Sequence, residues 1–303
     1  MAVTAAMVKE LRELSGAGMS ACKNALVEAE GDMTRAIEIL REKGLAAAAK
    51  KAGRIAAEGL VMTALSEDRK KGALVEVNSE TDFVAKNEDF VTFVKNVAIQ
   101  ALASSAATVE DLLAEKWVAD TSVTVQDVLT QKIATIGENI GIRRFERYNT
   151  NANSIVVDYI HGGGRVGVML EMVTDSAADA VIEAGRNVCM QIAAMSPQFL
   201  DRNSIPADYL DKEKEILIQQ TMAEGKPANI AEKMVEGRLN KALKEICLVD
   251  QEYVKDGEMN VAQYLKSVDA SLAVAKFTRY EKGEGIEKKE ENFAEEVSKA
   301  MQG

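Results

Sequence analysis

Two stretches of the chain, GLVMTALSEDRKKGALVEV (residues 59–77) and SIVVDYIHGGGRVGVMLEM (residues 154–172), are related by a fixed shift of 95 residues. The matched positions are Leu60 with Ile155, Val61 with Val156, Lys70 with Arg165, Gly72 with Gly167, Leu74 with Met169, Glu76 with Glu171 and Val77 with Met172. Each stretch has the pattern of a strand, a polar turn and a second strand. An internal repeat of this kind predicts two related structural units, with turns at residues 66–72 and 161–167.

Both copies continue beyond these hairpins in the same way. An amphipathic helix is predicted to begin near Glu88 in the first copy and near Asp179 in the second. A third strand closes each copy, because IGIRRFERY (residues 140–148) resembles AVAKFTRY (residues 273–280). We therefore expect an α+β protein with two related three-stranded antiparallel sheets, each with its helix.

The second copy is longer than the first. Its last strand lies at a shift of 132 residues, which leaves 37 extra residues before that strand. These residues predict a helical hairpin inserted at about residues 204–245, with Pro206 in the first turn of one helix and a turn at residues 225–227. The highly charged end of the chain, after Gly285, predicts a short surface helix or a partly disordered tail.

The N-terminal 44 residues predict a bundle of three short helices. Thr4, Ser20 and Asp32 are suited to cap them, and Gly44 is predicted to end the third. The Ala/Lys-rich residues 45–54 then predict a helical tether to the rest of the chain.

Composition excludes several classes of function. The chain of 303 residues has a net charge of −11, which opposes binding to nucleic acid, so a protein partner is expected. No apolar run reaches the roughly 18 residues of a membrane span, so no membrane association and a cytoplasmic location are expected. His161 is the only histidine, and the three cysteines (Cys22, Cys189 and Cys247) lie outside any CxxC spacing. We expect no metal, no cofactor and no catalytic residue.

The two copies diverge at the junction between strand and helix. There, TDFV (residues 81–84) falls on SAAD (residues 176–179). In one interpretation Thr81 or Asp82 caps the helix and Phe83 packs beneath it as a hydrophobic staple. In the other, Phe83 is an exposed anchor for another protein. The residues by themselves leave both interpretations open.

Seven motifs follow one another along the chain: VKELRELSGAGM with CKNALVEAEGDM (residues 8–33), KKAGRIAAEG (50–59), VNSETDFVAKNEDF (77–90), KIATIGENIGIRRF (132–145), IHGGGRVGVM (160–169), GKPANIAEKMVEGR (225–238) and EKGEGIEK (281–288). In this order they resemble the elongation factor Ts family over the whole chain. A small departure is SGAGM, where TGAGM would be expected, and Ser79 stands where the family often has cysteine.

The resemblance implies a domain plan. It comprises an N-terminal three-helix domain similar to ubiquitin-associated (UBA) domains with its tether (residues 1–54), a first core subdomain (55–149), a second core subdomain (150–282) that contains the hairpin insertion, and a C-terminal tail or helix (283–303). The inserted hairpin corresponds to the long form of the family and implies a homodimer contact through the hairpin.

The resemblance also implies a function, that of a non-enzymatic nucleotide exchange factor that binds the translation GTPase EF-Tu in its GDP-bound and nucleotide-free forms. Thr81, Asp82, Phe83 and Val84 would displace magnesium from EF-Tu and so promote GDP release. Met19, Lys23 and His161 would make further contacts with it. The N-terminal bundle taken alone suggests an alternative, a non-catalytic scaffold or a UBA-like peptide-binding protein.

Overall fold

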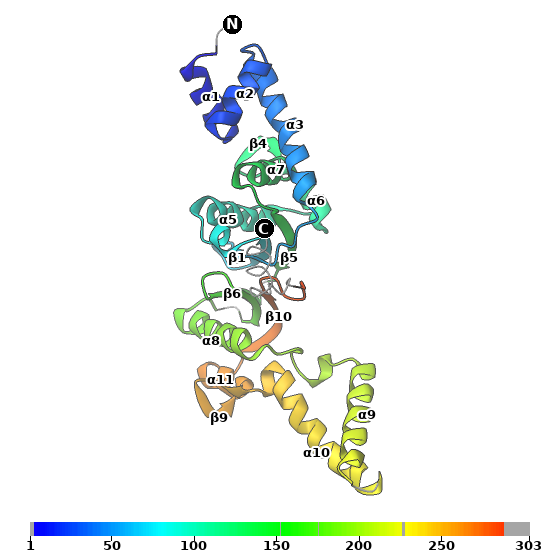
Figure 1. Ribbon diagram of the computed structural model, residues 1–303. Coiled ribbons are helices and arrows are strands. Elements are labelled where there is room, and N and C mark those ends of the chain that lie inside the picture. The colour runs from blue at the N-terminus through cyan, green and yellow to red at the C-terminus, as the bar shows by residue number, and fades with distance from the viewer. Residues whose placement is uncertain (1–2, 152, 175, 226–227, 288–303) are drawn as a thin grey trace. The chain divides into compact units, whose positions relative to one another are not determined.

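The computed structural model describes residues 3–151, 153–174, 176–225 and 228–287 (Figure 1). Helices and small antiparallel sheets make up these residues, which confirms the predicted α+β class. Contacts divide the described chain into two compact units. Unit 1 comprises the described parts of Met1–Met62, Val75–Phe145 and Glu281–Gly303, and unit 2 comprises those of Thr63–Leu74 and Glu146–Tyr280.

Three helices begin the chain: α1 (Ala5–Ser15), α2 (Met19–Glu28) and α3 (Met33–Lys51). Thr4 caps α1 by accepting a hydrogen bond from the Met7 N–H, and Asp32 caps α3 in the same way, as predicted. The cap predicted at Ser20 is wrong, because α2 already begins at Met19, behind Gly18, which has no side chain to cap it. The buried core of the bundle consists of Val8, Leu11, Cys22, Ala25, Leu26, Ala29, Ala36 and Ile39.

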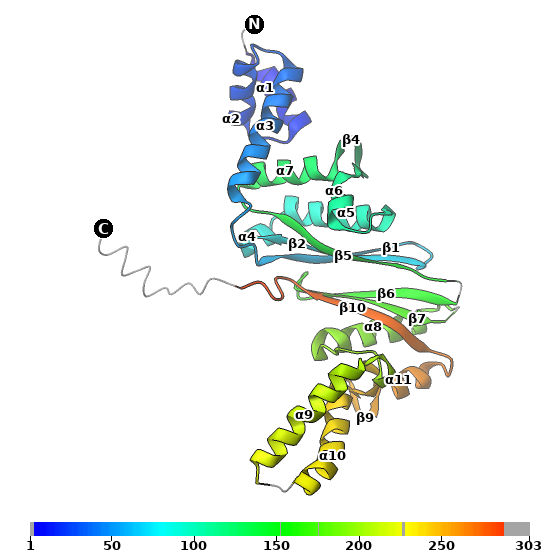
Figure 2. The ribbon, with the colours of Figure 1, turned by 90° about the vertical axis from the view of Figure 1, so that its right-hand side faces the viewer.

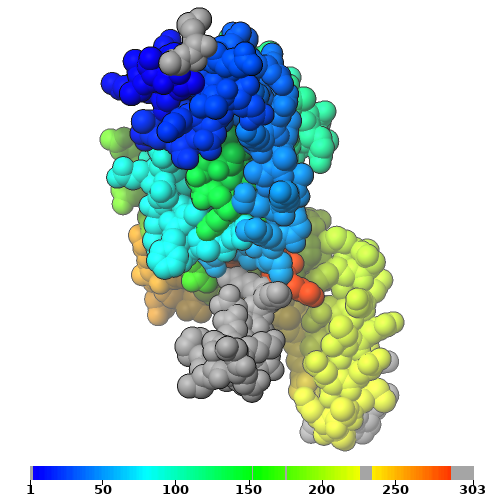
Figure 3. All heavy atoms as spheres, turned by 45° about the horizontal axis from the view of Figure 1, so that its top comes forward, coloured from blue at the N-terminus to red at the C-terminus, as the bar shows by residue number. Residues whose placement is uncertain are grey.

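Helix α3 runs through Gly44 without a break, so the predicted helix end at that residue is wrong. A methyl group built on Gly44 would lie 3.5 Å from the Thr130 side chain, on helix α7 (Val125–Ile136). That distance is an ordinary van der Waals contact, so the packing of α3 against α7 accounts for the unbroken helix, and a glycine is not required there. Arg41 adds an ion pair with Asp127 at 2.7 Å. Within unit 1, α3 thus lies against α7 (Figures 1 and 3).

Two sheets carry the repeat. The first joins β1 (Glu58–Leu65), β2 (Lys71–Ser79) and β5 (Gly141–Asn149) in the order β1-β2-β5, and the second joins β6 (Ser154–His161), β7 (Val166–Val173) and β10 (Ala273–Glu281) in the order β10-β7-β6. Both third strands are confirmed to within one residue of their predicted bounds. The turn predicted after His161 is confirmed as well, since His161 pairs with Val166 across it. Gly162, Gly163 and Gly164 all have positive φ, which glycine adopts without strain.

Helices cover the sheets as the repeat predicts. In unit 1 a single turn, α4 (Asp82–Ala85), precedes α5 (Glu88–Ala103), and α5 lies between the first sheet and α7 (Figure 2). In unit 2, α8 (Asp179–Met195) packs on β6 and β7. The predicted helix starts at Glu88 and Asp179 are both confirmed.

Each copy also has a small ribbon and helix that the fixed shift does not detect. The first has α6 (Val109–Ala114), β3 (Lys116–Trp117), β4 (Asp120–Thr124) and α7, and the second has β8 (Glu252–Tyr253), β9 (Asp256–Asn260) and α11 (Val261–Val268). One glutamine holds each ribbon: Gln100 accepts from the Val118 N–H at 2.6 Å, and Gln191 accepts from the Val254 N–H at 2.9 Å. The number of residues between the glutamine and its ribbon differs between the two copies, because the second copy contains the insertion. No single shift therefore aligns these equivalent residues.

The insertion is a pair of helices, α9 (Ala207–Ala223) and α10 (Ala228–Ile246), with short 3-10 turns at Arg202–Ser204 and Leu248–Asp250. Pro206 occupies the cap position and not the predicted first turn. Ile205, Leu243 and Cys247 form a buried cluster at the base of the hairpin, where it joins the rest of unit 2. Farther out, Arg238 pairs with Glu224 at 2.6 Å. Most of the predicted turn (residues 226–227) and most of the predicted tail (288–303) lie outside the described residues.

Trimming the outer hairpin should leave the protein folded. Replacing residues 213–236 by a short Gly/Ser link removes the Arg238–Glu224 contact but retains the cluster of Ile205, Leu243 and Cys247. We expect a single cooperative thermal transition close to that of the unmodified chain. As the matched control, Leu243→Ala in the full-length chain should lower the melting temperature, because it opens a cavity in that cluster. Non-cooperative melting of the trimmed chain would contradict the insertion interpretation.

Candidate protein-binding site

The segment predicted to carry function forms a separate turn between a strand and a helix. β2 ends at Ser79, and α5 begins behind Asn87, whose side chain accepts from the Asp89 and Phe90 N–H groups. α4 lies between them. Its cap is Thr81, whose hydroxyl accepts from the Val84 N–H at 3.4 Å. Thr81 therefore caps the separate turn α4, whereas the predicted helix α5 is capped by Asn87 and by neither Thr81 nor Asp82.

Phe83 points into solvent. The residue is 81% exposed, which is the largest value among the exposed large apolar residues that the structure describes. The hydrophobic staple is therefore wrong for Phe83, because a staple would bury the ring. In the second copy Ala178 directly precedes α8, with no side-chain cap at that position. The two copies thus differ at the junction where their sequences diverge.

A carboxylate from a distant loop holds this turn in place. Glu138 lies between α7 and β5, and its side chain accepts hydrogen bonds from the Glu80 N–H and the Thr81 N–H, both at 3.0 Å. It also accepts from the Thr81 hydroxyl at 2.6 Å. Three donors therefore converge on one carboxylate, and bonds to a charged acceptor are stronger than neutral ones.

The Glu80 side chain ties the same turn to two other segments. Its carboxylate accepts from the Asn139 N–H at 2.5 Å and lies 3.4 Å from Arg54, just after α3. The Asn139 amide in turn donates to the Arg54 carbonyl at 2.7 Å. Residues before β1, after β2 and before β5 are thereby joined next to the exposed phenylalanine.

Asp82 is engaged within the turn itself. It pairs with Lys86 at 2.6 Å, one helical turn later. The hydrogen bond from the Lys86 ammonium holds the pKa of Asp82 below its usual value. Both side chains are about half exposed or more, so this ion pair contributes little to stability.

The other predicted contact residues are also accessible. Met19 is 46% exposed at the start of α2, and Lys23 on the same helix is exposed. His161 is exposed in unit 2, and its Nδ1 lies 3.0 Å from the Tyr159 hydroxyl. Met19, Lys23 and residues 81–84 belong to unit 1, whereas His161 belongs to unit 2.

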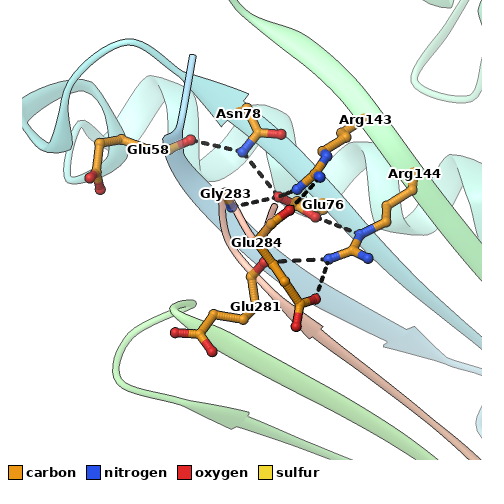
Figure 4. A network of polar contacts seen from close by, with 8 residues as sticks. All are labelled: Glu58, Glu76, Asn78, Arg143, Arg144, Glu281, Gly283 and Glu284. Carbon is orange, nitrogen blue, oxygen red and sulfur yellow. Dashed lines mark hydrogen bonds and ion pairs between the residues drawn. The ribbon is translucent and has the colours of Figure 1, made fainter. Parts of the chain in front are cut away.

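A buried charged network lies on β2 just before the turn (Figure 4). Glu76 is fully buried, and its carboxylate contacts Arg143 at 3.0 Å and Arg144 at 2.6 Å, both on β5. It also accepts from the Gly283 N–H at 2.7 Å and from the Asn78 amide at 3.1 Å. Burial by itself would raise the pKa of Glu76, but these hydrogen bonds outweigh it and lower the pKa. Through Glu76, the residues after β10 are attached to the first sheet.

Within the described residues, no set of three or more His, Cys, Asp or Glu side chains is grouped so that it could hold a metal ion. Among the same residues, no helix combines the length and apolar character needed to cross a bilayer. Cys22, Cys189 and Cys247 are all buried and form no disulfide.

Comparison with known proteins agrees with the resemblance. A family model described as elongation factor TS matches residues 80–284. An elongation factor Ts of Clostridium perfringens (strain ATCC 13124) is 56% identical over 301 residues, which cover 98% of each chain. Those of Clostridium novyi (strain NT) and Clostridium acetobutylicum (strain ATCC 824) are each 53% identical and cover 99% of each chain.

The chain belongs to the elongation factor Ts family. It is therefore a translation elongation factor, active in protein biosynthesis. The family match begins at Glu80, so it includes the exposed turn at residues 81–84.

Glu138 is the residue of this site that sequence reasoning missed. It lies inside the motif KIATIGENIGIRRF, 57 residues from Thr81, and carboxylates are abundant in this acidic chain. The motif itself was the only available signal, and it does not single out Glu138 among its polar residues.

Proposed function

We propose that this protein binds EF-Tu·GDP and promotes release of GDP, with residues 81–84 as the element that disturbs the magnesium site. The observation that carries the proposal is the 81% exposure of Phe83 on a turn held by Glu138 and Glu80. A large ring in water has no stabilising role in the free protein. Aromatic anchors buried on binding often dominate the energy of an interface.

The mechanism is reciprocal coupling between two ligands of the GTPase. If this protein binds nucleotide-free EF-Tu more tightly than the GDP form, it must weaken GDP binding by the same factor. Magnesium is a suitable target, because the ion is among the largest charges near the diphosphate. Exchange breaks no covalent bond, so the proposed function needs neither a catalytic residue nor a cofactor and is not enzymatic.

Further contacts follow from the exposed residues outside the turn. We assign Met19 and Lys23 on α2 to one contact with EF-Tu and His161 at the β6-β7 turn to another. The N-terminal bundle would act as the UBA-like domain of residues 1–54. The cores would comprise residues 55–149 and 150–282, followed by the C-terminal part at 283–303, with the hairpin as the surface for a homodimer. This protein would work in the cytoplasm without contacting nucleic acid or membrane, in keeping with its net charge of −11.

Release of a fluorescent GDP analogue from EF-Tu tests this function. With excess unlabelled GDP as the chase, adding this protein should accelerate release by at least about tenfold over the intrinsic rate. Raising the magnesium concentration should slow the stimulated release, because a higher concentration of the ion favours its rebinding to EF-Tu. An unchanged release rate would refute the exchange function. A stimulated release rate that does not change with magnesium concentration would refute disturbance of the magnesium site as the route.

A further inference from the structure

We propose that Glu138 is a positioning residue for the exchange reaction, an inference that rests on the proposed function. It sets the conformation of the turn that presents Phe83. Its carboxylate receives the Glu80 N–H, the Thr81 N–H and the Thr81 hydroxyl, which are the three donors immediately before α4.

The direction of the hydroxyl bond matters. A carboxylate can only accept, so the Thr81 hydroxyl must donate its proton to Glu138. Its lone pairs then face the Val84 N–H, which lies 3.4 Å away and needs an acceptor at the start of α4. Glu138 thus orients the cap as well as the backbone. Phe83 lies inside the single turn that this cap begins, so the direction of its ring depends on the bond.

The position of Glu138 in the fold makes it a rigid support for the turn. It follows Gly137, which ends α7 in a left-handed conformation with φ of 87°. The chain leaves the helix there and reaches the turn before β5 begins at Gly141. α7 is itself packed against α3. The carboxylate therefore lies on a short loop, residues 137–140, which is held at one end by a packed helix and at the other by a strand. A loop held at both ends keeps the geometry of a site better than a free loop does.

Pre-organisation is the expected benefit. A one-turn helix of four residues has little stability of its own, because nucleation is unfavourable. Without Glu138 the turn would have to be ordered when the partner binds, and that ordering lowers the affinity gained from Phe83. The residue acts through Phe83, so its effect should depend on the phenylalanine being present.

A double-mutant cycle with GDP release as the readout tests this dependence. Glu138→Ala should slow stimulated release by roughly tenfold, and Phe83→Ala by more. In the Phe83→Ala background, adding Glu138→Ala should have little further effect. Equal losses in both backgrounds, or release at the wild-type rate with Glu138→Ala alone, would overturn the proposal.

Conservative variants separate positioning from a general structural role. Glu138→Gln keeps an oxygen that can accept both N–H groups, but its amide donates where the Thr81 hydroxyl now donates. The rate of GDP release stimulated by Glu138→Gln should therefore lie between the rates of the wild type and of Glu138→Ala. Its melting temperature should be near that of the wild type. A Glu138→Gln protein that exchanges no better than Glu138→Ala would count against the proposal.

Amide hydrogen exchange in the free protein tests the clamp without EF-Tu. Glu138→Ala should reduce the protection from exchange of the Glu80, Thr81 and Val84 amides. The protection of the Phe90 amide, at the start of α5, should stay unchanged. Unchanged protection at the first three amides would refute the clamp. Failure of the wild type to stimulate GDP release would instead refute the proposed function, so the two failures are distinguishable.

Discussion

Phe83→Ala should leave the protein as stable as before and nearly abolish its activity in exchange. The ring is 81% exposed, so its removal opens no cavity and should change the melting temperature little. Truncation of an interface anchor commonly costs at least about 2 kcal/mol, which corresponds to a roughly thirtyfold loss. We therefore expect stimulated GDP release to fall by about thirtyfold or more. Thermal unfolding and GDP release measured on the same samples give both quantities.

Phe90→Ala is the matched control for this experiment. Phe90 lies seven residues farther along, on α5, and is completely buried. Its truncation should cost about 3 to 5 kcal/mol of unfolding free energy. A Phe83→Ala protein that loses comparable stability, or that exchanges nucleotide at the wild-type rate, would exclude Phe83 as the anchor.

Asp82→Ala should have a milder effect at the same turn. Thr81, and not Asp82, supplies the cap of α4, and the Asp82–Lys86 ion pair is exposed, so removal of the Asp82 side chain should leave the fold intact. Stimulated release should fall by no more than a few fold, within the range of a lost surface contact. A loss as large as that of Phe83→Ala would show that Asp82 carries the interaction.

Glu76→Ala should be the most destabilising single change in the network of Figure 4. Removing the carboxylate leaves Arg143 and Arg144 without their buried partner and the Gly283 N–H without its acceptor. Breaking a buried ion pair costs about 3 to 5 kcal/mol, and we expect about 3 because the arginines are roughly a third exposed. Denaturant unfolding measures this loss.

Glu171→Ala is the matched control, because Glu171 occupies the equivalent position of the second copy. Its side chain is nearly buried, but the Lys276 ammonium that pairs with it lies 3.9 Å away. Glu171→Ala should therefore cost clearly less than Glu76→Ala. Equal losses of unfolding free energy would show that burial of a glutamate at this position, and not the pairing of Glu76 with two arginines, determines the cost of its removal.

The same network predicts a pH dependence. The pKa of Glu76 is lowered in the folded protein, so the unfolded chain binds a proton more readily than the native one. Its stabilising contribution is complete above the unfolded pKa of about 4.3. It is lost as the pH falls from that value through the lower folded pKa. The stability difference between the wild type and Glu76→Gln should shrink over this window, and a difference that stays constant would contradict it.

Sequence by itself determined the elements of this protein wherever a local pattern specifies them. The repeat at a shift of 95 residues predicted both hairpins, and the match at a shift of 132 predicted the strand at residues 273–280. Helical periodicity predicted the helix starts at Glu88 and Asp179. Alternation and helical periodicity depend on neighbouring residues, so they can be read without knowing the fold. Comparison of the two copies also located the turn that we propose binds EF-Tu, because only one copy has TDFV.

Tertiary structure decided the features that depend on residues far apart in the sequence. Glycine is typical of helix ends, yet α3 continues through Gly44, because this helix packs against α7. Phe83 could be core or surface by residue type, and only the packing around the turn left it exposed. Glu138 meets Thr81 across 57 residues of chain. Such contacts depend on how distant elements pack, and a local pattern carries no information about its distant partner.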